Sequence, residues 1–236
     1  MSKKKGLGQN PRTGKGNQRT RARELQPNDA ILIVCEGSKT EPNYFKAFKL
    51  INCRVEIHGL GMNTKTLVAE AVEKWKAFAA DQNYFNQLWC VFDRDSFPQQ
   101  DYNDAFELIR SESMKINRQY KKRMGTPIHF EAAYTNEAFE LWYLLHFDYQ
   151  NTGVSRDQYK GKLDNRLPKP YKKNDPTMYE LLENLGVQTA GRQGQAFAIE
   201  NAKRLCAHAD PVQPHNTNPS TTVHLLVEEL NKYLKP

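Results

Sequence analysis

Apolar and polar positions form alternating blocks along the chain after residue 28. Short, nearly all-apolar runs predict buried strands, and longer segments whose apolar residues recur with helical spacing predict helices. The predicted strands are Ala30–Cys35, Cys53–Ile57, Gln87–Phe92 and Pro127–Ala133. The predicted helices that accompany them are Glu41–Leu50, Thr64–Ala80, Tyr102–Arg118 and Asn136–Phe147, the last with Asn136 as N-cap. Strands alternating with helices in this way predict an α/β fold with a parallel sheet flanked by helices.

The second half of the chain departs from this alternation. Residues 151–176 are rich in Lys and Pro and predict a long basic loop. Further helices are predicted at Thr177–Leu185, Gln195–His208 and Ser220–Leu234. The chain therefore divides into a tail (1–28), an α/β core (29–148), and a basic loop with a C-terminal helical extension (149–236).

The positive charge is concentrated at the N-terminus. The formal net charge is +7, and residues 1–24, with eight basic side chains and one acidic one, account for all of it. This segment has few apolar residues to bury and is predicted to be disordered. A flexible cationic arm suits a polyanion such as nucleic acid, which makes Arg19, Arg21 and Arg23 candidate contacts. The alternative is a tail that only aids solubility.

The sequence gives no indication of a membrane protein. No apolar run approaches the roughly 20 residues that a membrane helix needs, and the basic start is not followed by the apolar segment of a secretory signal. We therefore expect a cytoplasmic protein without a membrane partner.

The segment Ile31–Phe45, ILIVCEGSKTEPNYF, contains a Gly and a Lys and invites comparison with a phosphate-binding loop. The GxxxxGK[ST] pattern requires a second glycine directly before the lysine, and Ser38 occupies that position. The glycines of the tail are also wrongly spaced and follow no predicted strand. The sequence therefore excludes a nucleotide-hydrolysing site of this class on this chain.

Carboxylates follow two of the predicted strands. Glu36 comes directly after the first strand, and Asp93 and Asp95 follow the third. In a parallel sheet these positions lie at the carboxyl edge, where ligands bind. Residues two apart in extended chain point the same way, so both aspartates can face one site. Such a set of oxygen ligands suits Mg²⁺ or Mn²⁺, and these ions promote phosphodiester cleavage.

These residues carry a family resemblance. A strand followed by Glu-Gly, and a later strand followed by Asp-x-Asp, is similar to the Toprim domain of topoisomerases, primases and related nucleases. More closely, the chain resembles the RloB family in four segments: VCEGSKTEPNYF, VFDRDSF, TNEAFELWYLLHF and NPSTTVHLLVEEL. The resemblance implies a Toprim-like Rossmannoid core in which Glu36 is a metal ligand or general acid/base, and Asp93 and Asp95 are metal ligands.

The resemblance also implies a biological role. It suggests a Toprim-type nuclease that acts in bacterial anti-phage defence with an ABC/SMC-like ATPase encoded nearby. The apolar helix of the family pattern adds Glu140 as a further catalytic candidate, whereas Glu137 is better explained as a partner of the helix dipole.

Further basic residues are candidate phosphate contacts. They are Lys39, after the first strand, and Lys169, Lys172 and Lys173 in the predicted basic loop. A solvated, purely structural role is the alternative for each. DNA, RNA and tRNA all stay open as substrates, a homodimer is a further option, and the rival function is a catalytically silent adaptor that binds the ATPase or nucleic acid.

Overall fold

The fold is built on one parallel sheet. The computed structural model describes residues 29–94, 99–209 and 216–235. In these ranges the strands of the sheet are β1 (Asp29–Cys35), β2 (Cys53–Gly59), β3 (Gln87–Arg94) and β4 (His129–Asn136). They pair in the order β2-β1-β3-β4, all in parallel. The predicted α/β fold class, a parallel sheet flanked by helices, is confirmed.

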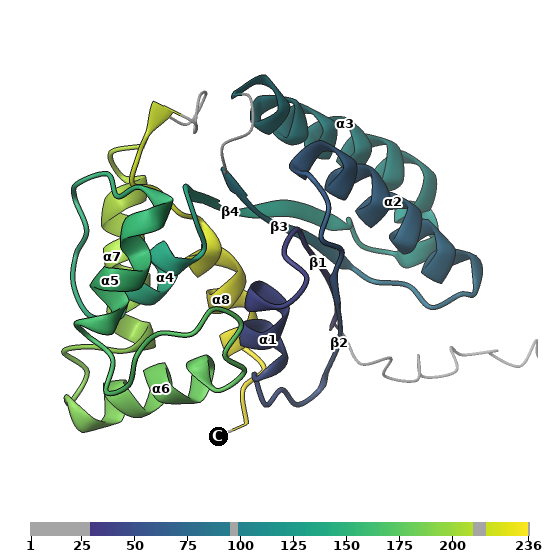
Figure 1. Cartoon of the computed structure of the whole chain (residues 1–236). Coiled ribbons are helices and arrows are strands. Elements are labelled where there is room, and N and C mark those ends of the chain that lie inside the picture. The colour runs from purple at the N-terminus through teal and green to yellow at the C-terminus, as the bar shows by residue number, and fades with distance from the viewer. Residues whose placement is uncertain (1–28, 95–98, 210–215, 236) are drawn as a thin grey trace, which may run out of the picture.

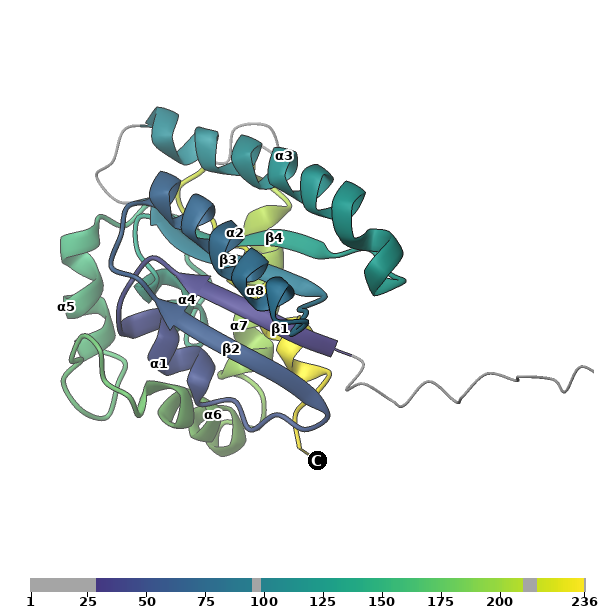
Figure 2. The ribbon, with the colours of Figure 1, turned by 90° about the vertical axis from the view of Figure 1, so that its right-hand side faces the viewer.

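The two faces of the sheet are covered by different sets of helices (Figures 1 and 2). Leu32 and Val34 point to the face covered by α2 (Thr64–Ala80) and α3 (Gln99–Met124). Ile31 and Ile33 point to the opposite face. That face is covered by α1 (Thr40–Lys46), α4 (Glu140–Leu145) and α8 (Val223–Asn231). Both faces are buried, which explains why the strands are almost entirely apolar.

The second half of the chain continues the layer beside α4. It contains a 3₁₀ turn η1 (Arg156–Gln158), α5 (Tyr159–Asp164), α6 (Met178–Gln188) and α7 (Gln195–Cys206). Their apolar residues, such as Leu163, share one core with the β1 face just described. The predicted basic loop over 151–176 is therefore only partly a loop, because η1 and α5 interrupt it. The division of the chain into domains stays a prediction.

The fourth strand is longer than predicted, and the helix after it is shorter. Asn136 was expected to cap a helix, but it is the last residue of β4 and pairs with Arg94 of β3. Its backbone N–H also donates to the carbonyl of Ser220 at 2.8 Å, on the other side of the strand. This pairing with a distant segment holds Asn136 in extended conformation, so α4 begins only at Glu140.

Helix α2 illustrates how local signals anchor the layers. The side chain of Asn63 accepts a hydrogen bond from the N–H of Thr66 at 3.0 Å and caps the helix. Near its other end, the indole N–H of Trp75 donates to the carbonyl of Phe85, just before β3, at 2.9 Å. None of the helices in the described ranges combines the length and apolar character needed to cross a membrane.

Candidate active site

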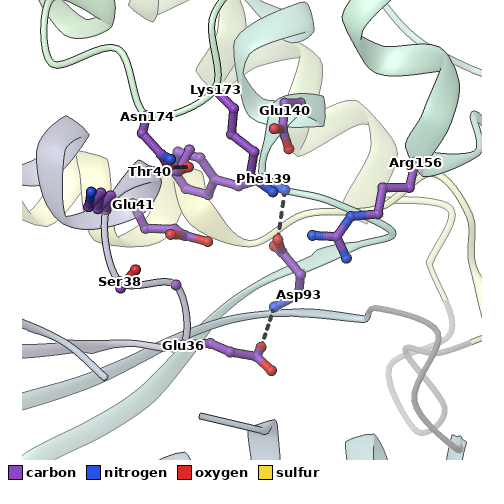
Figure 3. A pocket seen from close by; sticks show the side chains of 12 residues that line it. Glu36, Ser38, Thr40, Glu41, Asp93, Phe139, Glu140, Arg156, Lys173 and Asn174 are labelled. Atoms are coloured by element: carbon purple, nitrogen blue, oxygen red, sulfur yellow. Dashed lines mark hydrogen bonds between the residues drawn. The ribbon is translucent and has the colours of Figure 1, made fainter. Parts of the chain in front are cut away.

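A cavity of about 250 Å³ lies at the carboxyl ends of β1 and β3 (Figure 3). These strands are neighbours although β2 follows β1 in the chain, so the strand order reverses between them. Ligands of open α/β sheets bind at such switch points. The lining residues include four acids and three bases; the full set is Glu36, Gly37, Ser38, Lys39, Thr40, Glu41, Asp93, Phe139, Glu140, Arg156, Lys173 and Asn174.

Glu36 lies just beyond β1, where its carboxylate faces β3. Its Oε2 accepts the backbone N–H of Asp93 at 3.1 Å, and its Oε1 accepts the hydroxyl of Thr64, the first residue of α2, at 3.2 Å. Burial raises the pKa of Glu36 to about 7, although these hydrogen bonds lower it. A carboxyl group with this pKa can both hold and release a proton near neutral pH.

Asp93 lies at the end of β3, lines the cavity and is only 8% exposed. Its Oδ2 accepts the backbone N–H of Phe139, directly before α4, at 2.9 Å. Its Oδ1 is buried and has no hydrogen-bond partner among the described residues. Burial raises the pKa of Asp93 well above its usual value, and the charges of Glu41 and Glu140 raise it further.

Glu140 begins α4 and is also buried at the cavity. Its Oε1 accepts the hydroxyl of Tyr171 at 2.8 Å. The segment that carries Tyr171 is fixed to α1, because the Thr40 hydroxyl donates to Asn174 Oδ1 at 2.7 Å. A part of the predicted basic loop therefore lies against the cavity and positions one of its acids.

Glu41 is an acid of the cavity that the sequence analysis did not select. It lies in the first turn of α1 and is 6% exposed. Burial raises its pKa, and the charge of Glu140 contributes in the same direction. An acid in the first turn of a helix is ordinarily explained by the helix dipole, so its place after the Glu-Gly pair was the only available signal.

Three basic residues also line the cavity: Lys39, Arg156 and Lys173. All three are exposed, and Figure 3 shows Arg156 and Lys173 extending toward the region between Asp93 and Phe139. Lys39 and Lys173 were predicted from the sequence, whereas Arg156 was not. The charge of Arg156 lowers the pKa of Glu36 and of Glu41. The cavity thus combines three buried acids and the half-buried Glu36 with exposed bases.

Two further predicted site residues, Lys172 and Lys169, are not among the residues that line the cavity. Lys172 is exposed and is absent from the lining. Lys169 forms an ion pair with Asp175 at 2.8 Å instead. Asp95, together with the tail residues Arg19, Arg21 and Arg23, lies outside the described residues.

The cavity fits a hard divalent cation by the chemistry of its donors. Its lining includes no His or Cys, and two buried oxygens, Asp93 Oδ1 and Glu41 Oε2, have no partner in the described part of the chain. No three or more His, Cys, Asp or Glu side chains in the described ranges form a ready group of ligands around one point. Mg²⁺ usually keeps several water ligands and takes one or two carboxylates, so fewer protein ligands suffice.

Fold and site together define an α/β protein with an acidic cavity at the carboxyl edge of a parallel sheet. The chain belongs to the RloB-like family: the family model described as RloB-like protein matches residues 31–230. Comparisons with curated proteins and with solved structures found no match. The matched range includes every described residue that lines the cavity.

Proposed function

We propose that this chain is a metal-dependent nuclease that hydrolyses phosphodiester bonds of DNA or RNA, with tRNA among the candidates. The observation that supports this most directly is the cavity at the β1/β3 switch point, whose lining combines three buried acids and the half-buried Glu36 with exposed bases. Acids suit a divalent cation, and bases suit the phosphates of the substrate. One small site that offers both matches the needs of phosphodiester cleavage.

Glu36 and Asp93, joined by Asp95, are the residues that would hold Mg²⁺ or Mn²⁺. When bound, such an ion supplies an activated water and stabilises the charge that develops on the leaving oxygen. Asp93 is well held for this role, because the Phe139 N–H fixes one oxygen while the other is unpaired in the described structure. Glu36 is fixed in turn by the Asp93 N–H and by Thr64.

Proton transfer is the second task of the acidic side of the cavity, which consists of Glu36, Glu41, Asp93 and Glu140. Glu36 would take this role where it does not ligate the ion, because its pKa of about 7 in the metal-free protein matches a group that accepts a proton from an attacking water and later returns it. Glu140 assists, and the hydroxyl of Tyr171 orients it from the neighbouring segment. Glu36 is thus held by a backbone N–H at the end of a strand, and Glu140 by a side-chain hydroxyl at the start of a helix.

The substrate would be bound by the basic side of the cavity, which consists of its three bases. Lys39, Arg156 and Lys173 lie at the cavity, where they can neutralise the backbone phosphates next to the scissile bond. The tail with Arg19, Arg21 and Arg23 would add affinity that does not depend on nucleotide sequence. This division gives the acids the chemistry and the bases the position of the substrate.

Membership of the RloB-like family supports a proposed setting. In it, the chain is the effector of a bacterial anti-phage defence system and acts with an ABC/SMC-like ATPase encoded nearby. The sequence has no matching phosphate-binding loop, so nucleotide hydrolysis would belong to that partner. Restraint by the partner would protect the host from a nuclease that is otherwise toxic.

The test is cleavage of a substrate panel by the purified full-length chain. Plasmid, single-stranded DNA and tRNA are incubated with Mg²⁺ or Mn²⁺, with and without the ATPase. We expect one class to be cut, and the cutting to disappear with EDTA and in Glu36→Ala. Glu131→Gln, which alters an exposed acid on β4 away from the cavity, should cut like the unchanged chain.

A catalytically silent adaptor is the second candidate. It is favoured by the lack of a ready three-ligand group within the described ranges. If Asp93→Asn together with Asp95→Asn leaves both metal binding and host toxicity unchanged, the nuclease proposal fails. Binding to the ATPase or to nucleic acid without cleavage would then support the adaptor.

A further inference from the structure

The Glu41 carboxylate occupies an unusual position for a glutamate in the first turn of a helix. Such side chains commonly extend into solvent, but Glu41 is 6% exposed and its Oε2 is buried with no hydrogen-bond partner among the described residues. Figure 3 shows this carboxylate directed into the cavity toward Asp93. A buried oxygen without a partner is costly, which calls for an explanation.

Gly37 creates the space that the Glu41 carboxylate fills. A Cβ atom built on Gly37 would lie 2.0 Å from Glu41 Oε2 and 2.8 Å from Oε1. Any residue other than glycine would therefore push this carboxylate away from its position. The glycine of the Glu-Gly pair thus has a second role besides the turn: it admits the side chain of Glu41 into the cavity.

Asp93 offers the matching unpaired atom in the same cavity. Its Oδ1 is buried and lacks a partner in the described structure, whereas its Oδ2 is held by the Phe139 N–H. By contrast, both oxygens of Glu36 accept hydrogen bonds, from the Asp93 N–H and from the Thr64 hydroxyl. Among the described residues that line this cavity, the buried acceptor atoms without a partner are therefore on Glu41 and Asp93.

We propose that Glu41 is a cation-binding residue, and that Glu41 and Asp93 together ligate a Mg²⁺ or Mn²⁺ ion between them. This inference rests on the proposed function, because it concerns the ion of the same cavity. Two carboxylates and several waters satisfy a Mg²⁺ ion. The described residues of the lining include no His or Cys, which disfavours zinc.

The test is Mn²⁺ binding to the full-length chain. It is measured by calorimetry and by the loss of the electron paramagnetic resonance signal of free Mn²⁺. Glu41→Gln keeps the size of the side chain, and we expect it to weaken Mn²⁺ binding by about tenfold or more, as Asp93→Asn should. Gly37→Ala removes no ligand but displaces Glu41, so it should weaken binding as well. The clash in that variant involves the flexible end of a side chain, so the fold can accommodate it.

Glu183→Gln is the matched control. Glu183 also has a buried carboxylate oxygen without a partner in the described structure, and its pKa is also raised by burial. It lies in α6, outside the cavity lining. Its variant should bind Mn²⁺ like the unchanged chain, and circular dichroism should show that all variants are folded.

The possible outcomes separate this inference from the proposed function. If Glu41→Gln and Gly37→Ala bind Mn²⁺ normally while Asp93→Asn does not, Glu41 is no ligand and the inference fails, but a metal-dependent nuclease stands. If the unchanged chain binds no Mn²⁺, both fail. If only the Glu41, Gly37 and Asp93 variants lose binding, the inference is supported whether or not cleavage has been detected.

Discussion

The acidic and basic sides of the cavity differ in burial and in the elements that carry them. Asp93 and Glu41 are less than a tenth exposed, and they belong to a strand and a helix packed against the core. Lys39 and Lys173 are exposed and lie on connecting segments. A buried carboxylate oxygen without a partner costs stability, and the backbone that carries these two acids is held in regular secondary structure. Exposed bases on connecting segments cost little and can adjust to a substrate.

This contrast suggests that the acids carry out the chemistry and that the bases bind the substrate. The acidic side has a fixed geometry, as expected of residues that hold an ion and move protons. The basic side supplies charge at the entrance, where geometry is less demanding. Substitutions on the acidic side should therefore lower the cleavage rate strongly. Substitutions on the basic side should lower the affinity for the substrate moderately.

The largest effect is expected from Asp93→Asn. The amide keeps the shape of the side chain and can still accept the Phe139 N–H, but it removes the negative charge that favours the ion. Single-turnover cleavage should fall by about 100-fold or more, while the thermal midpoint of the metal-free protein should stay equal or rise. Cleavage within a few-fold of the unchanged chain would remove Asp93 from the chemistry.

A second prediction concerns stability against pH in the metal-free protein. The pKa of Glu36 is 4.5 without the fold and about 7 within it, because burial disfavours the charged form. The folded chain therefore keeps a proton that the unfolded chain has lost. The contribution of Glu36 to stability is fully present below pH 4.5 and is lost as the pH rises through 7.

This loss amounts to about 3 kcal/mol. The raised pKa values of Asp93 and Glu41 act in the same direction. Thermal denaturation in EDTA at pH 5 and pH 8 measures the effect, and Glu36→Gln should reduce the difference between the two midpoints. An identical difference in both proteins would show that Glu36 titrates normally.

On the basic side, neighbouring lysines allow a matched comparison. Lys173 lines the cavity, whereas the exposed Lys172 beside it does not. Lys173→Ala should weaken binding of the substrate by about tenfold and reduce the dependence of log affinity on log salt by about one. Lys172→Ala should have a clearly smaller effect in the same filter-binding assay. Equal effects would mean that a lysine at the cavity binds the substrate no better than any other exposed lysine.

The smallest effect is expected from Tyr171→Phe. This change removes the hydroxyl that donates to Glu140 Oε1 and leaves that oxygen without its donor. The free energy of unfolding should fall by about 1–3 kcal/mol, with cleavage reduced several-fold because Glu140 is less well oriented. Urea denaturation and single-turnover rates measure both quantities. Unchanged values for both would show that the bond contributes nothing in solution.

The parts of the fold and of the site that could be predicted from the sequence are those set by local pattern. Buried strands in a parallel sheet are continuous apolar runs, so the four strands and the acids after β1 and β3 were visible from local pattern alone. The meeting of Glu36 and Asp93 followed from the rule that parallel strands end at one edge. Glu140 was selected only through the family resemblance.

The residues that were missed depend on contacts between distant segments. Arg156 reaches the cavity from a part of the chain predicted as a basic loop, where η1 and α5 instead form. Glu41 has the sequence context of an ordinary helix-dipole partner, and only its burial over Gly37 distinguishes it. The start of α4 was misplaced because Asn136 pairs with β3 and with Ser220, neither of which is near it in sequence.

The central claim is that the acidic side of the cavity holds a divalent cation. A crystal structure of the full-length chain grown with Mn²⁺, with anomalous diffraction data, tests this most directly. We predict an anomalous peak in the cavity within coordination distance of Asp93 and Glu41, with Lys173 and Arg156 facing it from the entrance. Well-ordered acids with no peak at saturating Mn²⁺, or a basic side chain in the position of the ion, would contradict the claim.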